Sequence, residues 1–596
     1  MFLRLSAKPY AFFLNAVFLL PATGLLVWSQ ISPKPSQRPG AGAQAIYSEG
    51  MAAVQKGDLN SARASFEKVV QLAPSSPEAH NSLGWVLMQQ GQLETATAQF
   101  RAALKLKAGF VQAHVNLANA LSGERDFAEA ESEAREAVRL APKDSEAHRT
   151  LGRMMSFRAN LSGAIDELQT AIGLEPRRPD LHDDLGSLLE QTGKIGEGEV
   201  QFSEALRLNP EYLSAELHLG IVRWQQHELQ QAHDLLANAA QTSPQNPQAH
   251  YYFGRVLEDE KQDTEAIKQL KEAITLQPEF ADAQERLGVL SQRAGSIDDA
   301  IAAFRRLVQL RPDNPDAHNN LGLALLQSGD AASSMGEFDA ATRLRPDDAS
   351  YVENLGTAYL QRADFDSAIR QFQAALKIAP QDATAHYDLG LALKMKDRLP
   401  EAIAEFEKAV QLSPEQPDVH YTLGVTLWQK GDFAYAEREL IAATTAKPDY
   451  AEAFYLLGTV LKQEGKLDAA AVALRKAIDI SPGLVGAHTN LAAILRQQGD
   501  SVAADAESHR AQELFKQSNT LQAATFNTNS GKRLLQTGDV DGAIAQFRSA
   551  INLAPDYAPA HQLLGQALTQ KGQKDEADQE YRKAAQLAGT KPSVTN

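Results

Sequence analysis

The chain has 596 residues, more than one compact hydrophobic core usually holds, and its few aromatic residues (7%) and abundant alanine, leucine and glutamine favour helices over strands. The formal net charge of −17 at pH 7 excludes a nucleic-acid partner unless a basic stripe is present, and the sequence contains none. The absence of cysteine excludes disulfides, thiolate metal sites and cysteine nucleophiles.

Residues 1–29 predict a signal peptide or an N-terminal membrane anchor. Arg4 and Lys8 precede the apolar stretch 10–28, and this order of charges places the body of the chain outside the cytoplasm. Helix breakers inside the stretch favour cleavage, whereas its length approaches the about 20 residues that span a bilayer. We therefore expect an exported protein, either periplasmic or membrane-anchored, and leave the two open. Residues 30–42 are expected to form a Pro/Gly linker.

From residue 43 onward the sequence repeats with a period of 34 residues. Glycine recurs in one phase at Gly50, Gly84, Gly152, Gly186, Gly220, Gly254, Gly288, Gly322, Gly356, Gly390, Gly424 and Gly458, and alanine fills the two skipped phases. Proline recurs in another phase, and a small residue followed four positions later by a large apolar one recurs in a third. A period of this length is typical of stacked repeats.

Each repeat predicts two amphipathic helices joined by a tight turn. Apolar residues recur at helical spacing, a glycine such as Gly91 or Gly431 permits a left-handed cap, and proline ends the second helix. The in-phase glycines allow the two helix backbones to approach closely. One pair cannot bury its own apolar faces, so neighbouring pairs must stack, and the chain is expected to be all-α.

This pattern resembles the tetratricopeptide repeat (TPR). The family's motif appears here as HNNLGLAL and HYTLGVTLW, and Ala402, Phe406 and Pro414 close one unit. The resemblance implies a right-handed α-solenoid superhelix of about sixteen tandem repeats. Fourteen occupy residues 43–518 and two more form a C-terminal pair at 524–591.

The fourteenth repeat departs from the pattern. It has Ser508 in place of a large apolar residue and Lys516 in place of proline, and residues 519–523 are extra. With no breaker present, we predict a helix that continues past its usual end and a hinge at 519–523 between the array and the two-repeat tail. Residues 592–596 are expected to be a disordered tail.

Ten histidines share one phase of the repeat: His80, His114, His148, His182, His250, His318, His386, His420, His488 and His561. Successive rings would lie about 10 Å apart, whereas ligands of one metal ion each lie about 2.0–2.1 Å from it. We interpret these histidines as packing residues and predict neither a metal site nor a cofactor.

The first helix of each repeat carries the strongest functional signal. In TPR proteins these helices line a concave groove that holds a peptide, and the inward positions follow from the spacing to the in-phase glycine. The candidate groove residues are Tyr387, Tyr421 and Tyr455 in one inward phase, Trp428, Lys394, Lys462 and Arg496 in a second, and Trp224 with Tyr251 in a separate, weaker patch. Aromatic rings supply contact area and cations can meet carboxylates, so these residues are expected to contact a partner.

We expect a non-enzymatic protein–protein interaction scaffold that binds a protein or peptide ligand in this groove. No catalytic motif stands out, and no stretch outside the repeats is long enough for a catalytic domain. Two alternatives stay open: a periplasmic assembly factor for an envelope or polysaccharide-export complex, and the recognition subunit of a glycosyltransferase acting in a separate chain. Asn116, Asn320, Asn354, Asn490 and Asn529 share an inward phase, which resembles the asparagine ladder of the O-linked N-acetylglucosamine transferase superhelix. The sequence does not determine the oligomeric state.

Overall fold

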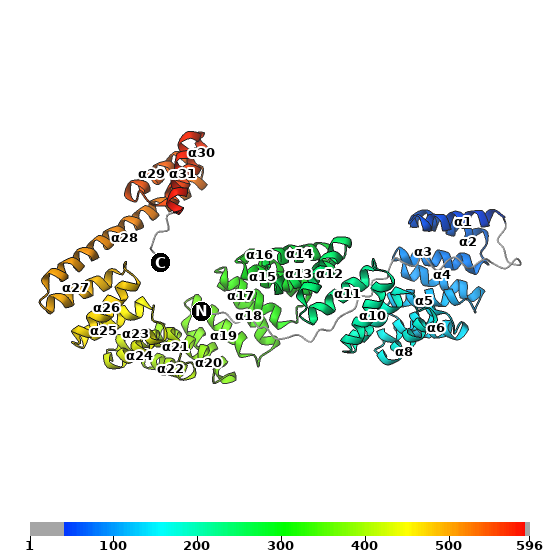
Figure 1. Ribbon diagram of the computed structural model, residues 1–596, viewed down its shortest axis with the longest axis horizontal. Coiled ribbons are helices and arrows are strands. Elements are labelled where there is room, and N and C mark those ends of the chain that lie inside the picture. Colours follow the sequence, from blue (N-terminus) through cyan, green and yellow to red (C-terminus); the bar gives the residue numbers. More distant parts are fainter. Residues whose placement is uncertain (1–40, 590–596) are drawn as a thin grey trace. The chain divides into compact units, whose positions relative to one another are not determined.

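The computed structural model describes residues 41–589, and within this range the regular structure consists of 31 α-helices with no strand (Figure 1). The predicted export or anchor segment, most of the predicted linker and the predicted tail lie outside the described residues. Helix α1 begins at Ala41, so the last two residues of the predicted linker are helical. Among the described residues, no helix is long and apolar enough to cross a bilayer.

The described residues form two compact units, an N-terminal unit of residues 41–312 and a C-terminal unit of residues 313–589. The N-terminal unit contains α1 (Ala41–Gln55), α2 (Leu59–Leu72), α3 (Pro77–Gln89), α4 (Leu93–Leu106), α5 (Val111–Gly123), α6 (Phe127–Leu140), α7 (Ser145–Phe157), α8 (Leu161–Leu174), α9 (Pro179–Gln191), α10 (Ile195–Leu208), α11 (Leu213–Gln225), α12 (Leu229–Thr242), α13 (Pro247–Asp259), α14 (Asp263–Leu276), α15 (Ala281–Arg293) and α16 (Ile297–Leu310). The C-terminal unit contains α17 (Pro315–Gln327), α18 (Ala331–Leu344), α19 (Ala349–Gln361), α20 (Phe365–Ile378), α21 (Ala383–Met395), α22 (Leu399–Leu412), α23 (Pro417–Lys430), α24 (Phe433–Ala446), α25 (Ala451–Gln463), α26 (Leu467–Ile480), α27 (Val485–Gln497), α28 (Ser501–Gln536), α29 (Val540–Leu553), α30 (Ala558–Lys571) and α31 (Lys574–Gly589). Within each unit, consecutive helices pack against one another, which is the predicted α-solenoid architecture.

Local sequence sets where these helices begin and end. Before α2, Asp58 accepts a hydrogen bond from the backbone N–H of Ser61 at 3.0 Å, which satisfies one free donor of the helix N-terminus. Gly91 and Gly431 adopt the predicted left-handed conformation, with φ of 75° and 88°. Six repeats place a residue other than glycine at this turn, among them Ala363 and Asp397 with φ of 58°. The turn geometry is therefore imposed by the helices on either side and not by glycine alone.

The in-phase glycine of each first helix makes room for a large side chain on the second helix. A β-carbon added at Gly390 would lie 2.6 Å from the ring of Phe406, and that ring is fully buried. In all fourteen repeats with this glycine, a large residue follows sixteen positions later, whereas both repeats with alanine have a small residue there. The two exceptions pair Ala118 with Ala134 and Ala492 with Ser508. A larger residue on the first helix is thus accompanied by a smaller one on the second, so that the two side chains do not overlap where the helices pack closely.

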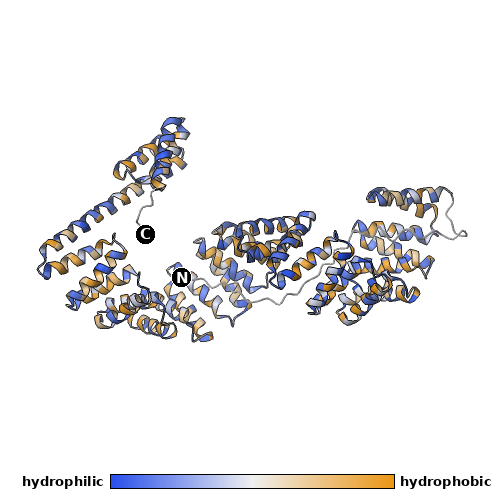
Figure 2. Ribbon diagram, in the orientation of Figure 1, coloured by the Kyte–Doolittle hydropathy of each residue, from blue (hydrophilic) through white to orange (hydrophobic). Residues whose placement is uncertain are grey.

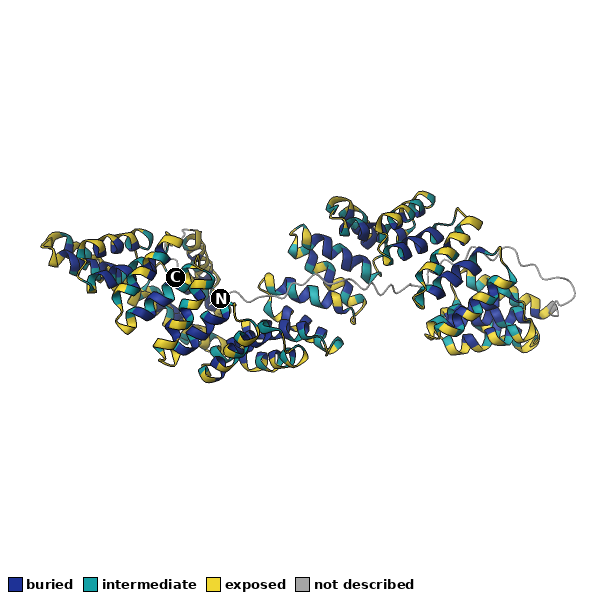
Figure 3. Ribbon diagram, turned by 90° about the horizontal axis from the view of Figure 1, so that it is seen from below, coloured by how far each residue is buried: buried dark blue, intermediate teal, exposed yellow. Residues whose placement is uncertain are grey.

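Hydrophobic and hydrophilic residues occupy different sides of the helices (Figure 2). The buried residues follow the seams between packed helices, and the turns are exposed (Figure 3). Eight phenylalanines lie at the centre of these seams with at most 1% of their surface exposed: Phe66, Phe100, Phe202, Phe304, Phe338, Phe372, Phe406 and Phe547. Burying a phenylalanine side chain contributes about 1.5–3 kcal/mol, so the repeated seam is the main source of stability.

Helix α28 confirms the prediction for the fourteenth repeat. It runs without a break through 36 residues, including the extra residues 519–523 (Figure 1). Its first part packs on α27 and its later part on α29 and α30, so the 31 helices make sixteen repeats with one helix shared. Phe526 is 68% exposed, although most of the equivalent positions in other repeats hold buried alanines such as Ala453. The insertion has carried the fifteenth repeat away from the second helix that would cover this position. The hinge at 519–523 stays a prediction.

The in-phase histidines join the two helices of their repeat to the turn before them. His420 has Nδ1 2.7 Å from a carboxylate oxygen of Glu439 and Nε2 2.9 Å from the carbonyl oxygen of Pro414. In all ten repeats Nδ1 lies 2.5–2.8 Å from a side-chain oxygen 19 residues later, glutamate in seven and glutamine in three. The predicted packing role is confirmed, but this polar bridge was not predicted. Within residues 41–589, no group of three or more acidic or histidine side chains is arranged to hold a metal ion.

The bridge at His114 predicts a pH-dependent stability. Burial alone would lower the pKa of His114, but its hydrogen bonds with Glu133 and the Ala108 carbonyl raise the pKa above its ordinary value. A raised pKa in the folded state means that the bridge stabilises the fold below the unfolded-state pKa and loses this effect as pH rises through the folded-state pKa. We expect Glu133→Gln to lower the free energy of unfolding by about 1 kcal/mol at pH 5.5 and by much less at pH 9.

Urea denaturation of the unmodified chain and of the Glu133→Gln variant, at pH 5.5 and at pH 9, measures the change in the free energy of unfolding. Glu94→Gln removes an exposed carboxylate from the neighbouring helix α4 and serves as the control, with no change expected at either pH. Equal destabilisation by Glu133→Gln at pH 5.5 and pH 9 would contradict the raised pKa of His114.

Candidate functional site

Within each unit, the first helices of neighbouring repeats contact each other and form one face. We call the side chains three and two residues before the in-phase glycine, together with those four and five residues after it, the first-helix face. Six hydrogen bonds join the residue three before the in-phase glycine to the residue two before the next in-phase glycine or alanine, 35 residues later: Tyr47–Ser82, Asn81–Asn116, Arg149–Asp184, Asp183–His218, Asn319–Asn354 and Tyr387–Thr422. Because first helices of neighbouring repeats contact each other and second helices do not contact each other comparably, this is the inner side of the stack within each unit.

The three predicted tyrosines lie on this face, on the first helices of three consecutive repeats, α21, α23 and α25. Tyr387 is half-buried, and its hydroxyl lies 3.1 Å from Oγ1 of Thr422. Burial raises the pKa of Tyr387, while the bond to Thr422 acts in the opposite direction. Tyr421 and Tyr455 are partly exposed, and among residues 41–589 their hydroxyls have no hydrogen-bond partner. Two phenol groups therefore remain available to a ligand.

The second predicted position, four residues after the in-phase residue, holds one indole and three cations on α21, α23, α25 and α27. Trp428 is partly exposed and donates its Nε1–H to Gln463 at 2.7 Å. Lys462 donates to the neutral amide oxygen of Asn490 at 3.2 Å, and Arg496 forms an exposed pair with Asp505 at 3.3 Å. Lys394 is half-buried, and burial lowers its pKa. The structure thus brings together all seven residues of the main predicted patch on four consecutive repeats.

Trp224 and Tyr251 of the weaker patch belong to the core instead. They are 8% and 4% exposed, and the guanidinium of Arg255 lies 4.7 Å from the Trp224 ring centroid. Trp224 donates its Nε1–H to Asp259 at 2.7 Å, and Tyr251 packs on Phe280 with 4.8 Å between ring centroids. Because the rings are covered by neighbouring repeats, the site proposed below does not include them.

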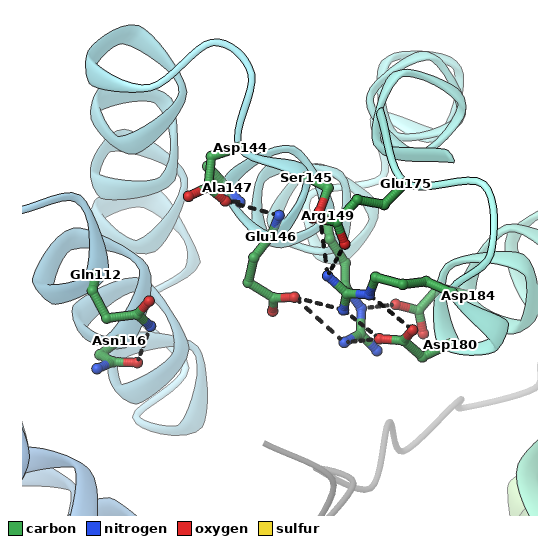
Figure 4. A network of polar contacts seen from close by, with 11 residues as sticks. Gln112, Asn116, Asp144, Ser145, Glu146, Ala147, Arg149, Glu175, Asp180 and Asp184 are labelled. Carbon is green, nitrogen blue, oxygen red and sulfur yellow. Dashed lines mark hydrogen bonds and ion pairs between the residues drawn. The ribbon is translucent and has the colours of Figure 1, made fainter. Parts of the chain in front are cut away.

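In the N-terminal unit, Arg149 and Asp184 of this face belong to a dense network of charges that extends beyond the face, shown in Figure 4. Nε of Arg149 lies 2.6 Å from Asp184 and its Nη1 lies 2.7 Å from Asp180. Arg178 reaches Asp180 and, at 2.8 Å, Glu146. Burial raises the pKa of Asp180, but the hydrogen bond from Arg178 and the charges of both arginines outweigh burial and lower it. The opposite charges satisfy one another, so the network joins the fourth and fifth repeats.

Sequence reasoning missed these polar pairs and the contribution of Tyr450. The Tyr450 ring packs on Tyr421 with 5.0 Å between centroids, and its hydroxyl donates to Asp418 at 3.0 Å. Arg149 and Asp183 occupy the same phase as Tyr421, so the spacing that found the tyrosines could have found them. Three of the five in-phase asparagines, Asn116, Asn354 and Asn490, also use their amides in contacts between repeats.

Solved structures that resemble the chain include several repeat proteins. MamA is 27% identical, with 28% of this chain and 96% of MamA covered and a TM-score of 0.27. The Cut9–Hcn1 hetero-tetramer of APC/C is 14% identical, with 88% of this chain and 96% of that chain covered and a TM-score of 0.34. YrrB, described as a TPR protein with an unusual peptide-binding site, is 23% identical, with 32% and 97% covered and a TM-score of 0.29. No curated protein matches significantly.

Family models give the assignment directly. One tetratricopeptide repeat model matches residues 47–109, 184–247, 285–349, 354–417 and 421–485, which is more than half of the chain. Further models of the same repeat match residues 87–154, 223–288, 531–572 and 558–591. These matches agree with the sixteen helix pairs and with the paired glycine and phenylalanine at their seams. The chain belongs to the tetratricopeptide repeat family.

Proposed function

We propose that the chain is a non-enzymatic scaffold that binds a segment of a partner protein on the first-helix face of repeats eleven to fourteen. The contact surface consists of α21, α23, α25 and α27. Family membership supports a role in protein–protein interaction, and the position of the contact is our own inference from the geometry of this face.

The observation that carries the proposal is the unbroken row of partly exposed rings on the first helices of three consecutive repeats. Tyr421 and Tyr455 offer hydroxyls with no hydrogen-bond partner among the described residues, and Trp428 lies about two turns further along α23. Tyrosine and tryptophan supply much contact area with few rotatable bonds and dominate the binding energy of many interfaces. The rings are partly buried between the stacked repeats, so their side chains lose little conformational freedom on binding.

The double variant Tyr421→Ala/Trp428→Ala tests this surface. Loss of two central aromatic contacts is expected to weaken partner binding at least about 30-fold, since one such residue contributes about 2 kcal/mol or more. The measurement is quantitative affinity purification with the tagged full-length chain from cells that express it, followed by mass spectrometry and by binding constants for the recovered partner.

The matched control removes exposed apolar side chains from other faces. Val472 on α26 and Phe515 on α28 are 65% and 59% exposed, and Val472→Ala/Phe515→Ala should leave partner binding unchanged. Circular dichroism confirms that both double variants are folded. Retention of the same partners at the same affinity by Tyr421→Ala/Trp428→Ala would exclude this face as the contact surface.

A further inference from the structure

We propose that the segment bound on repeats eleven to fourteen is acidic, with carboxylates that meet Lys394, Lys462 and Arg496 and an apolar side chain that packs on Trp428. This inference rests on the proposed function and adds the chemical class of the ligand. It starts from an unusual distribution of charge: the chain as a whole carries −17, yet three cations lie together on this face.

At one position of this face, cations occur in repeats eleven, thirteen and fourteen and in none of the ten repeats before them. The position four residues after the in-phase glycine holds Lys394, Trp428, Lys462 and Arg496 in repeats eleven to fourteen. In the ten preceding repeats the same position holds Val54, Met88, Ser122, Ser156, Glu190, Trp224, Glu258, Gln292, Leu326 and Leu360. The helix macrodipole favours a cation in the last turn, but it acts equally on those ten helices. A cause specific to repeats eleven to fourteen is therefore required.

Two of the three cations have no carboxylate partner within the fold. Lys394 forms no hydrogen bond or ion pair with any other residue in the range 41–589, although its side chain is half-buried. By contrast Lys396, two residues away and more exposed, pairs with Asp366 at 3.0 Å. Lys462 forms one hydrogen bond with the described residues, to the neutral amide oxygen of Asn490. Partly burying an ammonium group without an opposite charge is unfavourable, and a carboxylate from a ligand would remove that cost.

The third cation can exchange its partner. Arg496 and Asp505 are 58% and 76% exposed, so their pair is screened by water and contributes little. The guanidinium can take a ligand carboxylate with two parallel hydrogen bonds instead. Charge complementarity therefore favours an anionic segment over a basic or a neutral one.

The spacing of the row gives an approximate ligand pattern. Neighbouring first helices are about 10 Å apart, and an extended peptide spans about 3.3 Å per residue. A carboxylate at Lys394 would thus be followed about three residues later by an apolar residue at Trp428, then by carboxylates at Lys462 and Arg496 at similar intervals. A ten-residue peptide with glutamate at positions 1, 7 and 10, leucine at position 4 and serine or glycine elsewhere meets this pattern.

Fluorescence anisotropy with this labelled peptide and the full-length chain tests the proposal. We expect the peptide to bind, the version with glutamine in place of glutamate to bind at least tenfold more weakly, and binding of the glutamate peptide to weaken as NaCl rises from 50 to 500 mM. Lys394→Gln/Lys462→Gln should weaken the glutamate peptide at least tenfold.

The control carries the same change of charge on the second helices of the same repeats. Lys408 on α22 and Lys476 on α26 are exposed, and Lys408→Gln/Lys476→Gln should alter the affinity less than twofold. Equal binding of the glutamate and glutamine peptides, no effect of Lys394→Gln/Lys462→Gln, or no binding of the glutamate peptide at 1 mM would each overturn the proposal. If both peptides bind equally and Tyr421→Ala/Trp428→Ala abolishes binding, the contact face stands and only its preference for acidic ligands is refuted.

Discussion

Replacing Phe406 by alanine is expected to lower the free energy of unfolding of the C-terminal unit by about 3–5 kcal/mol. The ring is fully buried between α21 and α22, with its edge against Gly390 and its centroid 5.7 Å from that of Tyr387. Removing it leaves a cavity that two packed helices cannot close. Urea denaturation of the full-length chain, followed by circular dichroism at 222 nm, measures the loss. Phe515→Ala removes the same side chain from an exposed position and should cost less than about 0.5 kcal/mol.

Combining this change with Gly390→Ala tests whether the glycine and the ring act as a pair. Gly390→Ala alone should cost about 1–3 kcal/mol, because its β-carbon would lie 2.6 Å from the Phe406 ring. In the double variant the new methyl group occupies part of the space left by the ring, as Ala118 and Ala134 share their seam in the third repeat. We therefore expect the double variant to lose about 1–2 kcal/mol less than the sum of the two single changes. A strictly additive result would contradict the volume pairing.

Replacing Arg149 by methionine is expected to lower the free energy of unfolding of the N-terminal unit by about 3–5 kcal/mol. Arg149 is 7% exposed, and its loss leaves Asp184 and Asp180 buried with a smaller positive charge beside them. Arg178 continues to pair with Asp180 but forms no ion pair with Asp184. Differential scanning calorimetry and urea denaturation of the full-length chain both measure this change.

The pH dependence of the Arg149 variant provides an independent check. The lowered pKa of Asp180 means that its carboxylate stabilises the fold above the unfolded-state pKa and loses this effect as pH falls through the folded-state pKa. The difference in the free energy of unfolding between the unmodified chain and Arg149→Met should therefore be largest at pH 7 and should decrease on acidification below about pH 4. Arg139→Met is the control, because Arg139 is 67% exposed and pairs only with Glu136 on its own helix. A loss as small as that of the control would assign Arg149 a negligible structural role.

Much of the fold follows from local sequence because each repeat encodes the same two helices. The missing proline at Lys516 was enough to predict that α28 continues through the insertion. The bridge from His420 to Glu439 was not predictable in this way, because it depends on how two helices pack across 19 residues. Turns with a positive φ at residues other than glycine, such as Ala363, were missed for the same reason. The packing of the helices determines both features, and the conformational propensity of the local sequence does not indicate how the helices pack.

Burial on the first-helix face could be predicted less well, as the two tryptophans demonstrate. Trp224 and Trp428 share one phase of the repeat, yet the first is covered and the second is partly exposed. Tyr252 and Arg255 lie against Trp224, with the Tyr252 ring centroid 6.0 Å from that of Trp224. The positions that correspond to these two covering residues beside Trp428 hold smaller side chains, leucine and threonine. Accessibility therefore depends on residues one repeat away, which a position-by-position reading does not compare.

Site-specific photo-crosslinking tests the central claim that a partner binds the first-helix face. A photoreactive phenylalanine analogue is placed at Tyr421 on α23 and, in a separate protein, at Val472 on the exposed side of α26. The account predicts that the probe at Tyr421 yields one dominant crosslinked partner in cells and that the probe at Val472 does not capture it. Capture of the same partner from Val472 and not from Tyr421 would contradict the account.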